Sequence, residues 1–198
     1  MQNVGLDIEK QTRSGGRSEK ILMAIHQATY ELLQLRDYDE IELTEIARRA
    51  QVNKTTVYRR WATKAELVLD VILMRIKADL PLPDTGAVLS DLCIFLKMLQ
   101  HMLQQSFILN IFKVFISNQD AQVSIARQRF WNERFLLAQP LIDRAVQRGE
   151  LFEGTQVREF FEFACAPIFY RTLIIGELIS DQDIEILSLR TISYFSKQ

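Results

Sequence analysis

Two short amphipathic segments joined by a three-residue turn constrain this chain more than any other feature. Apolar residues recur at helical spacing over 43–50, and a second helical segment follows over 54–61. Between them stands Gln51-Val52-Asn53, which predicts a tight turn. A pair of short helices joined in this way is typical of a helix-turn-helix, whose second helix lies in the major groove of DNA.

Positive charge is concentrated in the same segment. The chain as a whole has a net charge of −1, but residues 44–64 hold six cations against the single acid Glu45. This window is therefore net +5 and the remainder is net −6. A basic segment on an otherwise acidic chain indicates a polyanion-binding surface, although charge alone fits a solvated helix face equally well. The cations are Arg48, Arg49, Lys54, Arg59, Arg60 and Lys64.

Helical periodicity continues through the rest of the chain, and nowhere is there the alternation of a strand. The expected fold class is all-α: a three-helix helix-turn-helix domain at the N-terminus and a larger helical domain at the C-terminus. Pro81 and Pro83 mark the boundary between them, and Pro140 predicts a kink or a break. The other expected helices cover residues 18–35, 63–80, 88–105, 107–116, 121–148, 157–178 and 181–195.

Residues 1–16 show no periodicity and are expected to form a flexible arm. They lack the apolar core of a secretory signal, and no apolar run approaches the roughly 20 residues that cross a bilayer. Cys93 and Cys165 stand far apart in apolar segments, so we interpret them as small buried side chains. These features predict a cytoplasmic protein without membrane contact.

The candidate DNA contacts follow from residue chemistry on the second short helix. Lys54 can reach guanine or a phosphate, while Thr55 and Thr56 add hydroxyl donors at the helix N-terminus. Tyr58 lies one turn after Thr55 and can touch a thymine methyl. Arg59 and Arg60 point to either side of that face, and Lys64 is placed to hold the phosphate chain.

The run Ile46-Ala47-x-x-Ala50-x-Val52-Asn53-Lys54-x-Thr56-Val57-Tyr58-Arg59-Arg60-Trp61-x-Thr63-Lys64-x-Glu66-Leu67 resembles the signature of the TetR family of transcriptional regulators. The resemblance is close over residues 17–69. It implies base contacts from Lys54, Thr55 and Tyr58, and phosphate contacts from Thr56, Arg60 and Lys64.

The chain departs from that signature at three places. Gln51 replaces the usual glycine before the turn valine, and Trp61 replaces the commoner phenylalanine. Glu42-Leu43 replaces the threonine that usually opens the second helix and contacts a phosphate, so Thr44 is the candidate substitute. The spacing from Ile46 to Leu67 has no insertion.

The last two helices are candidates for a homodimer interface. Residues 157–178 are apolar on nearly the whole helix circumference, which requires cover from two sides. The final helix has two apolar stripes, Ile184/Leu187/Ile192/Phe195 and Ile186/Leu189. A thick monomer core is the alternative. The resemblance favours dimerisation through about residues 157–195.

Aromatic and methionine side chains gather in the middle of the chain, where plain core packing is the commoner interpretation. The resemblance implies an effector cavity there, in a C-terminal effector-binding and dimerisation domain over 84–198 that follows a helix-turn-helix domain with its linker helix over 17–80. The candidate ligand contacts are Met98, His101, Met102, Phe112, Phe115, Trp131 and Phe135.

These expectations describe a DNA-binding regulator, and the resemblance favours a repressor released from a palindromic operator by a small molecule. A dimeric DNA-binding protein without a ligand is the alternative. A helical enzyme is disfavoured, because no acid–base pair, nucleophile with base, or metal-ligand spacing is evident. No cofactor or metal is expected.

Overall fold

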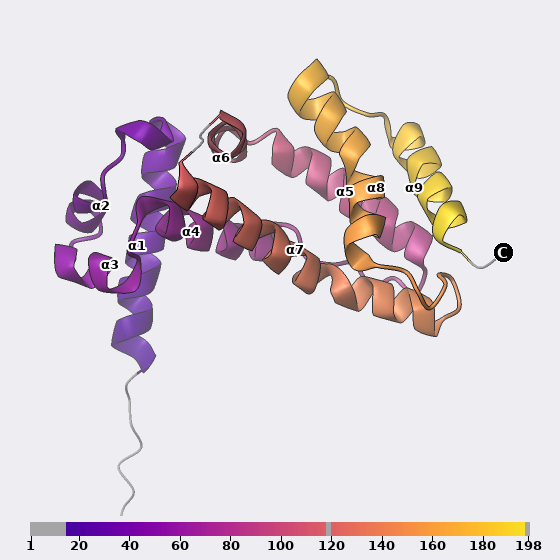
Figure 1. Ribbon diagram of the computed structural model, residues 1–198, viewed down its shortest axis with the longest axis horizontal. Coiled ribbons are helices and arrows are strands. Elements are labelled where there is room, and N and C mark those ends of the chain that lie inside the picture. The colour runs from indigo at the N-terminus through magenta and orange to yellow at the C-terminus, as the bar shows by residue number, and fades with distance from the viewer. Residues whose placement is uncertain (1–14, 118–119, 197–198) are drawn as a thin grey trace, which may run out of the picture.

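The computed structural model describes residues 15–117 and 120–196, and every regular element in these ranges is helical (Figure 1). The predicted all-α fold is confirmed. The elements are α1 (Gly15–Leu35), the 3₁₀ turn η1 (Tyr38–Glu40), α2 (Leu43–Arg49), α3 (Lys54–Arg60), α4 (Lys64–Asp79), α5 (Val88–Leu103), α6 (Ser106–Ser117), α7 (Ala121–Gln147), α8 (Val157–Phe169), the π-helical turn η2 (Tyr170–Ile175) and α9 (Asp181–Phe195).

Most of the predicted arm lies outside the described residues, but its last two residues belong to α1. That helix begins at Gly15 rather than at Ser18 as expected. None of the helices in the described ranges combines the length and the apolar character that a bilayer crossing requires.

Helices α1 to α3 form a small head at one end of the molecule (Figure 1). Asn53 starts α3, because its side chain accepts a hydrogen bond from the Thr55 amide at 3.0 Å. Glu42 precedes α2 and makes no capping bond with its side chain. Gln51 adopts a left-handed φ of +56°, so the turn forms without glycine at a cost of about 1 kcal/mol.

A capping box starts α4 with one difference from the usual pattern. The Thr63 hydroxyl accepts from the Glu66 amide at 3.2 Å. The Glu66 carboxylate, however, accepts from the Ala62 amide at 2.8 Å rather than from Thr63. The carboxylate of Glu66 therefore binds the residue before Thr63, and so fixes Ala62 in the linker between α3 and α4. Helix α4 ends at Asp79, before Pro81.

Helix α7 runs from the head to the far end of the remaining helices (Figure 1). It continues without a break from Ala121 to Gln147, so the break considered at Pro140 is wrong. Pro140 lies on the exposed side of the helix, and Leu136, whose carbonyl loses its amide partner, is 70% exposed. Solvent can satisfy that carbonyl, which makes the proline tolerable here.

Helix α8 is shorter than predicted. It ends at Phe169, and the chain continues through η2 to Gly176 rather than as α-helix to Leu178. Pro167 has no amide hydrogen, which weakens the α-helical ladder just before this wider turn. Gly176 then ends the element with a φ of +81°, a conformation that favours glycine.

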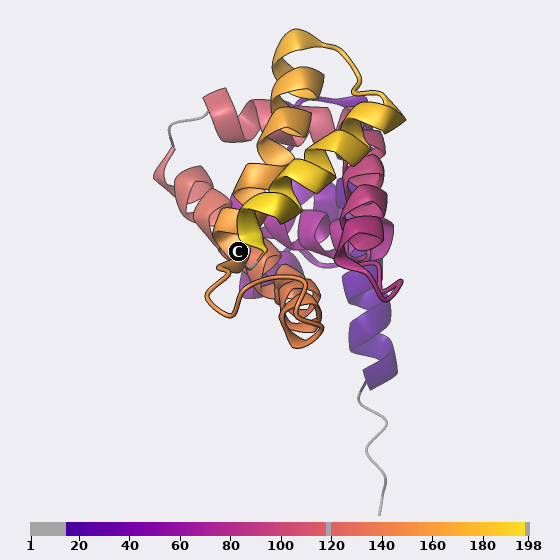
Figure 2. The same cartoon turned by 90° about the vertical axis from the view of Figure 1, so that its right-hand side faces the viewer.

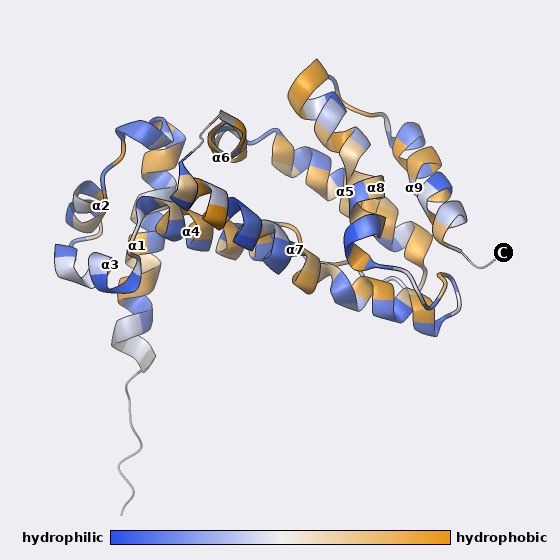
Figure 3. Ribbon diagram, in the orientation of Figure 1, coloured by the Kyte–Doolittle hydropathy of each residue, from blue (hydrophilic) through white to orange (hydrophobic). Residues whose placement is uncertain are grey.

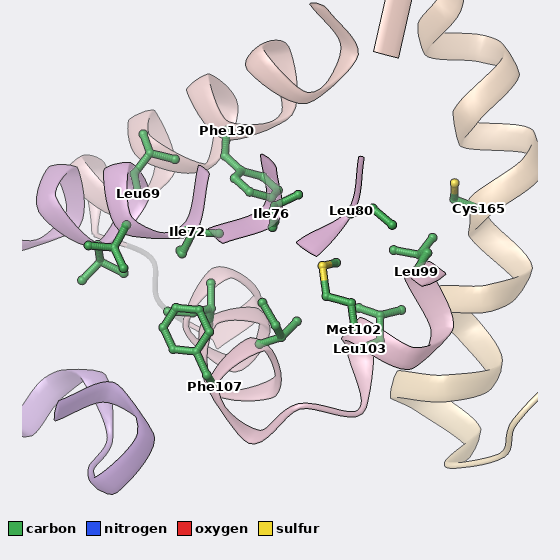
Figure 4. Close-up of a cluster of buried hydrophobic side chains, with 14 of the residues drawn as sticks. Leu69, Ile72, Ile76, Leu80, Leu99, Met102, Leu103, Phe107, Phe130 and Cys165 are labelled. Atoms are coloured by element: carbon green, nitrogen blue, oxygen red, sulfur yellow. The ribbon is translucent and has the colours of Figure 1, made fainter. Parts of the chain in front are cut away.

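A continuous hydrophobic core joins the head to the C-terminal helices. Figure 4 shows Leu69, Ile72 and Ile76 of α4 packed near Phe107 of α6 and Phe130 of α7. All five side chains are buried. Helix α4 is therefore shared by both parts of the molecule.

Candidate functional site

Helix α3 turns its basic and aromatic residues to the surface of the head. Val57 is fully buried and anchors the helix, while Lys54, Arg59 and Arg60 are exposed. Tyr58 is 48% exposed, so this large aromatic side chain lies outside the core of the head. The structure thus brings most of the predicted contacts onto one surface. Thr44, at the start of α2, is also exposed.

Five of the six cations of the basic window lie on α2 and α3, and they divide into two groups. Arg49 pairs with Glu31 at 2.7 Å and Arg48 lies 3.9 Å from Glu45, so both have acidic neighbours within the head. The three cations of α3 form no ion pair with any residue in the described ranges. An exposed helix with unpaired cations suits the phosphates and base edges of DNA.

The two threonines of α3 are less available than expected. The Thr55 hydroxyl donates to Asn53 Oδ1 at 2.8 Å, which commits its single hydrogen to the cap. Thr56 is half-buried, and its amide donates to the Asn53 carbonyl at 2.9 Å. These contacts shape the start of α3.

Lys64 holds the head together from the start of α4. Its Nζ donates to the carbonyls of Tyr38 and Ile41 at 2.7 and 2.8 Å, and it lies 4.2 Å from the centre of the Tyr38 ring. Burial lowers the pKa of its ammonium group. Burial also raises the pKa of the Tyr38 hydroxyl to about 12. Two of the three Lys64 donors are thus used within the protein, where the sequence predicted a phosphate contact.

We expect Lys64→Met to lower the free energy of unfolding by about 1–2 kcal/mol, because two charge-assisted hydrogen bonds are lost from a half-buried site. Lys54→Met is the matched control, since Lys54 is exposed and has no partner among the described residues. Its effect should stay within about 0.5 kcal/mol. Urea unfolding of both variants measures the difference; equal stabilities would contradict the role of Lys64.

Asp70 connects three helices behind the recognition surface. Its Oδ2 accepts from Trp61 Nε1 at 3.1 Å and from His26 Nε2 at 3.3 Å, so α4 is tied to the end of α3 and to α1. The hydrogen bond from His26 is the main reason that the pKa of Asp70 is lowered. The sequence analysis missed this cluster, because its members are 9 and 44 residues from Asp70.

A cavity of about 800 Å³ lies among α4, α5, α6, α7 and α8. Figure 4 shows Phe130 beside Ile76, and Leu80 near Leu99 and Met102; all five belong to its wall. Volume and lining are typical of a small-molecule site. The wall comprises Ile76, Leu80, Phe95, Leu99, Met102, Phe112, Gln128, Phe130, Trp131, Asn132, Arg134, Phe135, Ala138, Arg158, Phe161, Glu162, Cys165, Ala166 and Phe169.

Some of the predicted ligand-binding residues line this cavity and others do not. Those that line it are Met102, Phe112, Trp131 and Phe135. His101 is exposed and Met98 is half-buried, and neither belongs to the wall of this cavity. Both lie on α5, whose inward face is formed instead by Phe95, Leu99 and Met102 at helical spacing. The side chain of Phe115 lies outside the described residues.

Comparison with known proteins identifies both halves of the chain. Residues 25–71 match the family described as bacterial regulatory proteins, tetR family, and residues 82–188 match the tetracyclin repressor-like C-terminal domain. The regulator YdeS of Bacillus subtilis (strain 168) is 33% identical over 172 residues, which cover 85% of this chain and 86% of YdeS. The chain belongs to the TetR family.

Other relatives of this TetR-family protein support the same assignment. AqdR of Rhodococcus erythropolis is 32% identical over 149 residues, covering 75% of this chain and 70% of AqdR. The crystal structure of the TetR family transcription regulator SCO0332 has a TM-score of 0.75 at 25% identity and covers 90% of this chain and 100% of that one. The chain is therefore a helix-turn-helix transcriptional regulator, from a family whose members bind DNA and act as dimers.

The TetR-family C-terminal domain exposes an apolar surface on α8, η2 and α9. Helices α8 and α9 lie side by side on the outward face in Figure 2, and Figure 3 shows hydrophobic residues along both. The rings of Phe163 and Tyr194 stack at 5.3 Å and extend this surface from one helix to the other. Its exposed members, the α8–α9 surface, are Phe163 (44%), Tyr170 (56%), Ile174 (68%), Ile175 (45%), Leu178 (54%), Ile186 (37%), Leu189 (48%) and Tyr194 (64%).

Proposed function

We propose that this regulator is a homodimeric repressor that leaves a palindromic DNA operator when a small molecule enters the C-terminal cavity. The observation that carries the proposal is the position of α4. This helix contributes Ile76 and the following Leu80 to the cavity wall, and it holds the head through Lys64 and Asp70. A change at the cavity therefore has a direct route to the recognition helix.

In this proposal α3 enters the major groove. Lys54 and Tyr58 contact base edges, while Arg59 and Arg60 contact bases or phosphates on either side. All four side chains are exposed along α3. Thr44 and Thr56 supply additional contacts to DNA phosphates. In this proposal the side chains of α3 bind DNA and catalyse no reaction. The protein works in the cytoplasm, where the bacterial chromosome lies.

The α8–α9 surface supports the proposed dimer. One side of α8 is buried through Phe160, Ala164 and Ile168, while Phe163 and the following Tyr170 of η2 remain outside. The two stripes of α9 divide in the same way, with Ile184 and Phe195 inward and Ile186 and Leu189 outward. Exposed apolar patches of this kind are covered in stable oligomers.

The release mechanism is a two-state equilibrium. In one state the two heads of the dimer fit successive major-groove faces, about 34 Å apart. In the other state the cavity is occupied and the spacing of the heads is wrong. A ligand shifts this equilibrium only by its different affinity for the two states.

Capture of genomic fragments by the purified protein, with and without candidate effectors, tests this function. The expected result is enrichment of a short palindromic sequence that an effector removes. Enrichment that no effector changes would favour a ligand-independent DNA-binding protein. No enrichment of any sequence would overturn the proposal.

A further inference from the structure

The cavity wall contains one half-buried cation, Arg134, that the sequence analysis did not single out. Arg134 lies on α7, and no hydrogen bond or ion pair joins its guanidinium to any residue in the described ranges. Burial lowers the pKa of this group. An arginine stays charged at neutral pH even so, and a charge that is partly withdrawn from water without a partner favours an anion beside it.

The other charged groups of the wall neutralise each other. Arg158 Nε donates to Glu162 Oε1 at 2.8 Å, and the guanidinium of Arg158 also lies 5.6 Å from the centre of the Phe135 ring. Glu162 is therefore already paired one turn away on α8. The remaining polar wall residues, Gln128 and Asn132, are neutral amides. One positive charge, that of Arg134, is left for whatever occupies the cavity.

The rest of the wall is dominated by aromatic rings. Trp131 lies at the centre of this group, with ring centres of Phe169, Phe135 and Phe112 at 5.9, 6.3 and 6.4 Å. Such rings favour flat or aromatic ligands through offset and edge contacts. A volume of about 800 Å³ accommodates a molecule of drug-like size.

We infer that the effector is a mainly aromatic molecule that carries one acidic oxygen group, and that Arg134 binds this group. The inference rests on the proposed ligand-binding role of the cavity and adds the chemical class of the ligand. The planar guanidinium presents parallel N–H donors to a carboxylate or a similar oxyanion. The aromatic walls cover the remainder of the ligand.

A matched pair of small molecules tests this inference on the full-length protein. The fluorescent neutral probe N-phenyl-1-naphthylamine occupies the cavity, and naphthalene-2-carboxylate or the isosteric naphthalene-2-carboxamide displaces it. Trp131 lines the cavity and can transfer energy to the probe bound there. We expect the carboxylate to displace the probe at about 10-fold lower concentration than the amide, as one charge-assisted hydrogen-bonded pair predicts.

Variants of Arg134 and Arg158 test whether the preference for the carboxylate depends on Arg134. Arg134→Gln should abolish the advantage of the carboxylate and leave displacement by the amide unchanged, while Arg134→Lys should keep part of it. Arg158→Gln is the matched control and should keep the full preference, since Arg158 is already paired with Glu162. Arg134→Met, which retains the apolar stem, replaces Arg134→Gln if circular dichroism shows that the latter does not fold.

Three results would overturn the inference: no displaceable probe binding, equal displacement by both molecules in the wild type, or a preference that persists without Arg134. Operator binding is measured separately without any small molecule. Failure of that measurement counts against the proposed DNA-binding function, whereas the displacement result decides only the ligand class.

Discussion

Alanine at Lys54 or at Tyr58 is expected to abolish specific binding to the operator while leaving the fold intact. Both side chains are exposed on α3 and have no hydrogen bond within the described part of the protein, so their removal costs little stability. A lost base contact costs about 1–3 kcal/mol. A dimer loses each contact twice, which weakens binding by about 30-fold to more than 10,000-fold.

Fluorescence anisotropy with labelled operator and with a scrambled duplex measures this loss. Lys77→Ala is the matched control, because Lys77 is an exposed lysine near the end of α4 and away from α3. Thermal unfolding monitors the fold of each variant. If Lys54 contacts a phosphate rather than a base, the variant should instead weaken both duplexes and reduce the salt slope by about 1 per contact. Unchanged specific affinity in both variants would show that α3 is not the recognition helix.

Local signals in the sequence were sufficient for most of the fold. Asn53 and Thr63 accept hydrogen bonds from amides two and three residues later, and Ser180 starts α9 in the same way. Capping of this kind depends only on neighbouring residues. Apolar periodicity then fixed the buried face of each helix, including the division of α9 into Ile184 inward and Leu189 outward.

Contacts between distant residues were not predictable in the same way. Lys64 was placed near phosphates by analogy with the family, but its Nζ reaches carbonyls 23 and 26 residues earlier in the chain. Arg134 stands among polar residues of α7, and its burial depends on how α8 packs across that helix. No periodic pattern separates a solvated arginine from one that lines a cavity.

The length of α8 shows the limit of apolar periodicity. Residues 157–178 are hydrophobic enough to continue as one helix, but Gly176 adopts a left-handed φ and ends the element. The preceding wider turn contains Tyr170 and Ile174, which are exposed, as is Leu178 after it. A feature missed by the sequence analysis thus shapes the surface proposed for dimerisation.

Charged residues on the α8–α9 surface are expected to separate the dimer. Ile174→Glu together with Leu189→Glu places two carboxylates per protomer on side chains that are 68% and 48% exposed in the single chain. Each carboxylate would be buried without a partner in the dimer, at a cost of several kcal/mol. The folded protomer tolerates the changes, because neither side chain belongs to its core.

Loss of the dimer should in turn weaken operator binding by about 100-fold or more, because the second head no longer binds at a high effective concentration. Ile116→Glu is the matched control: Ile116 is 64% exposed but lies on α6, outside the α8–α9 surface. Light scattering at micromolar concentration should give a monomer for the double variant and a dimer for the control. A wild type that is itself monomeric, or a double variant that remains dimeric, would contradict the assignment of this surface, and retained operator affinity in a monomeric variant would show that one head suffices for binding.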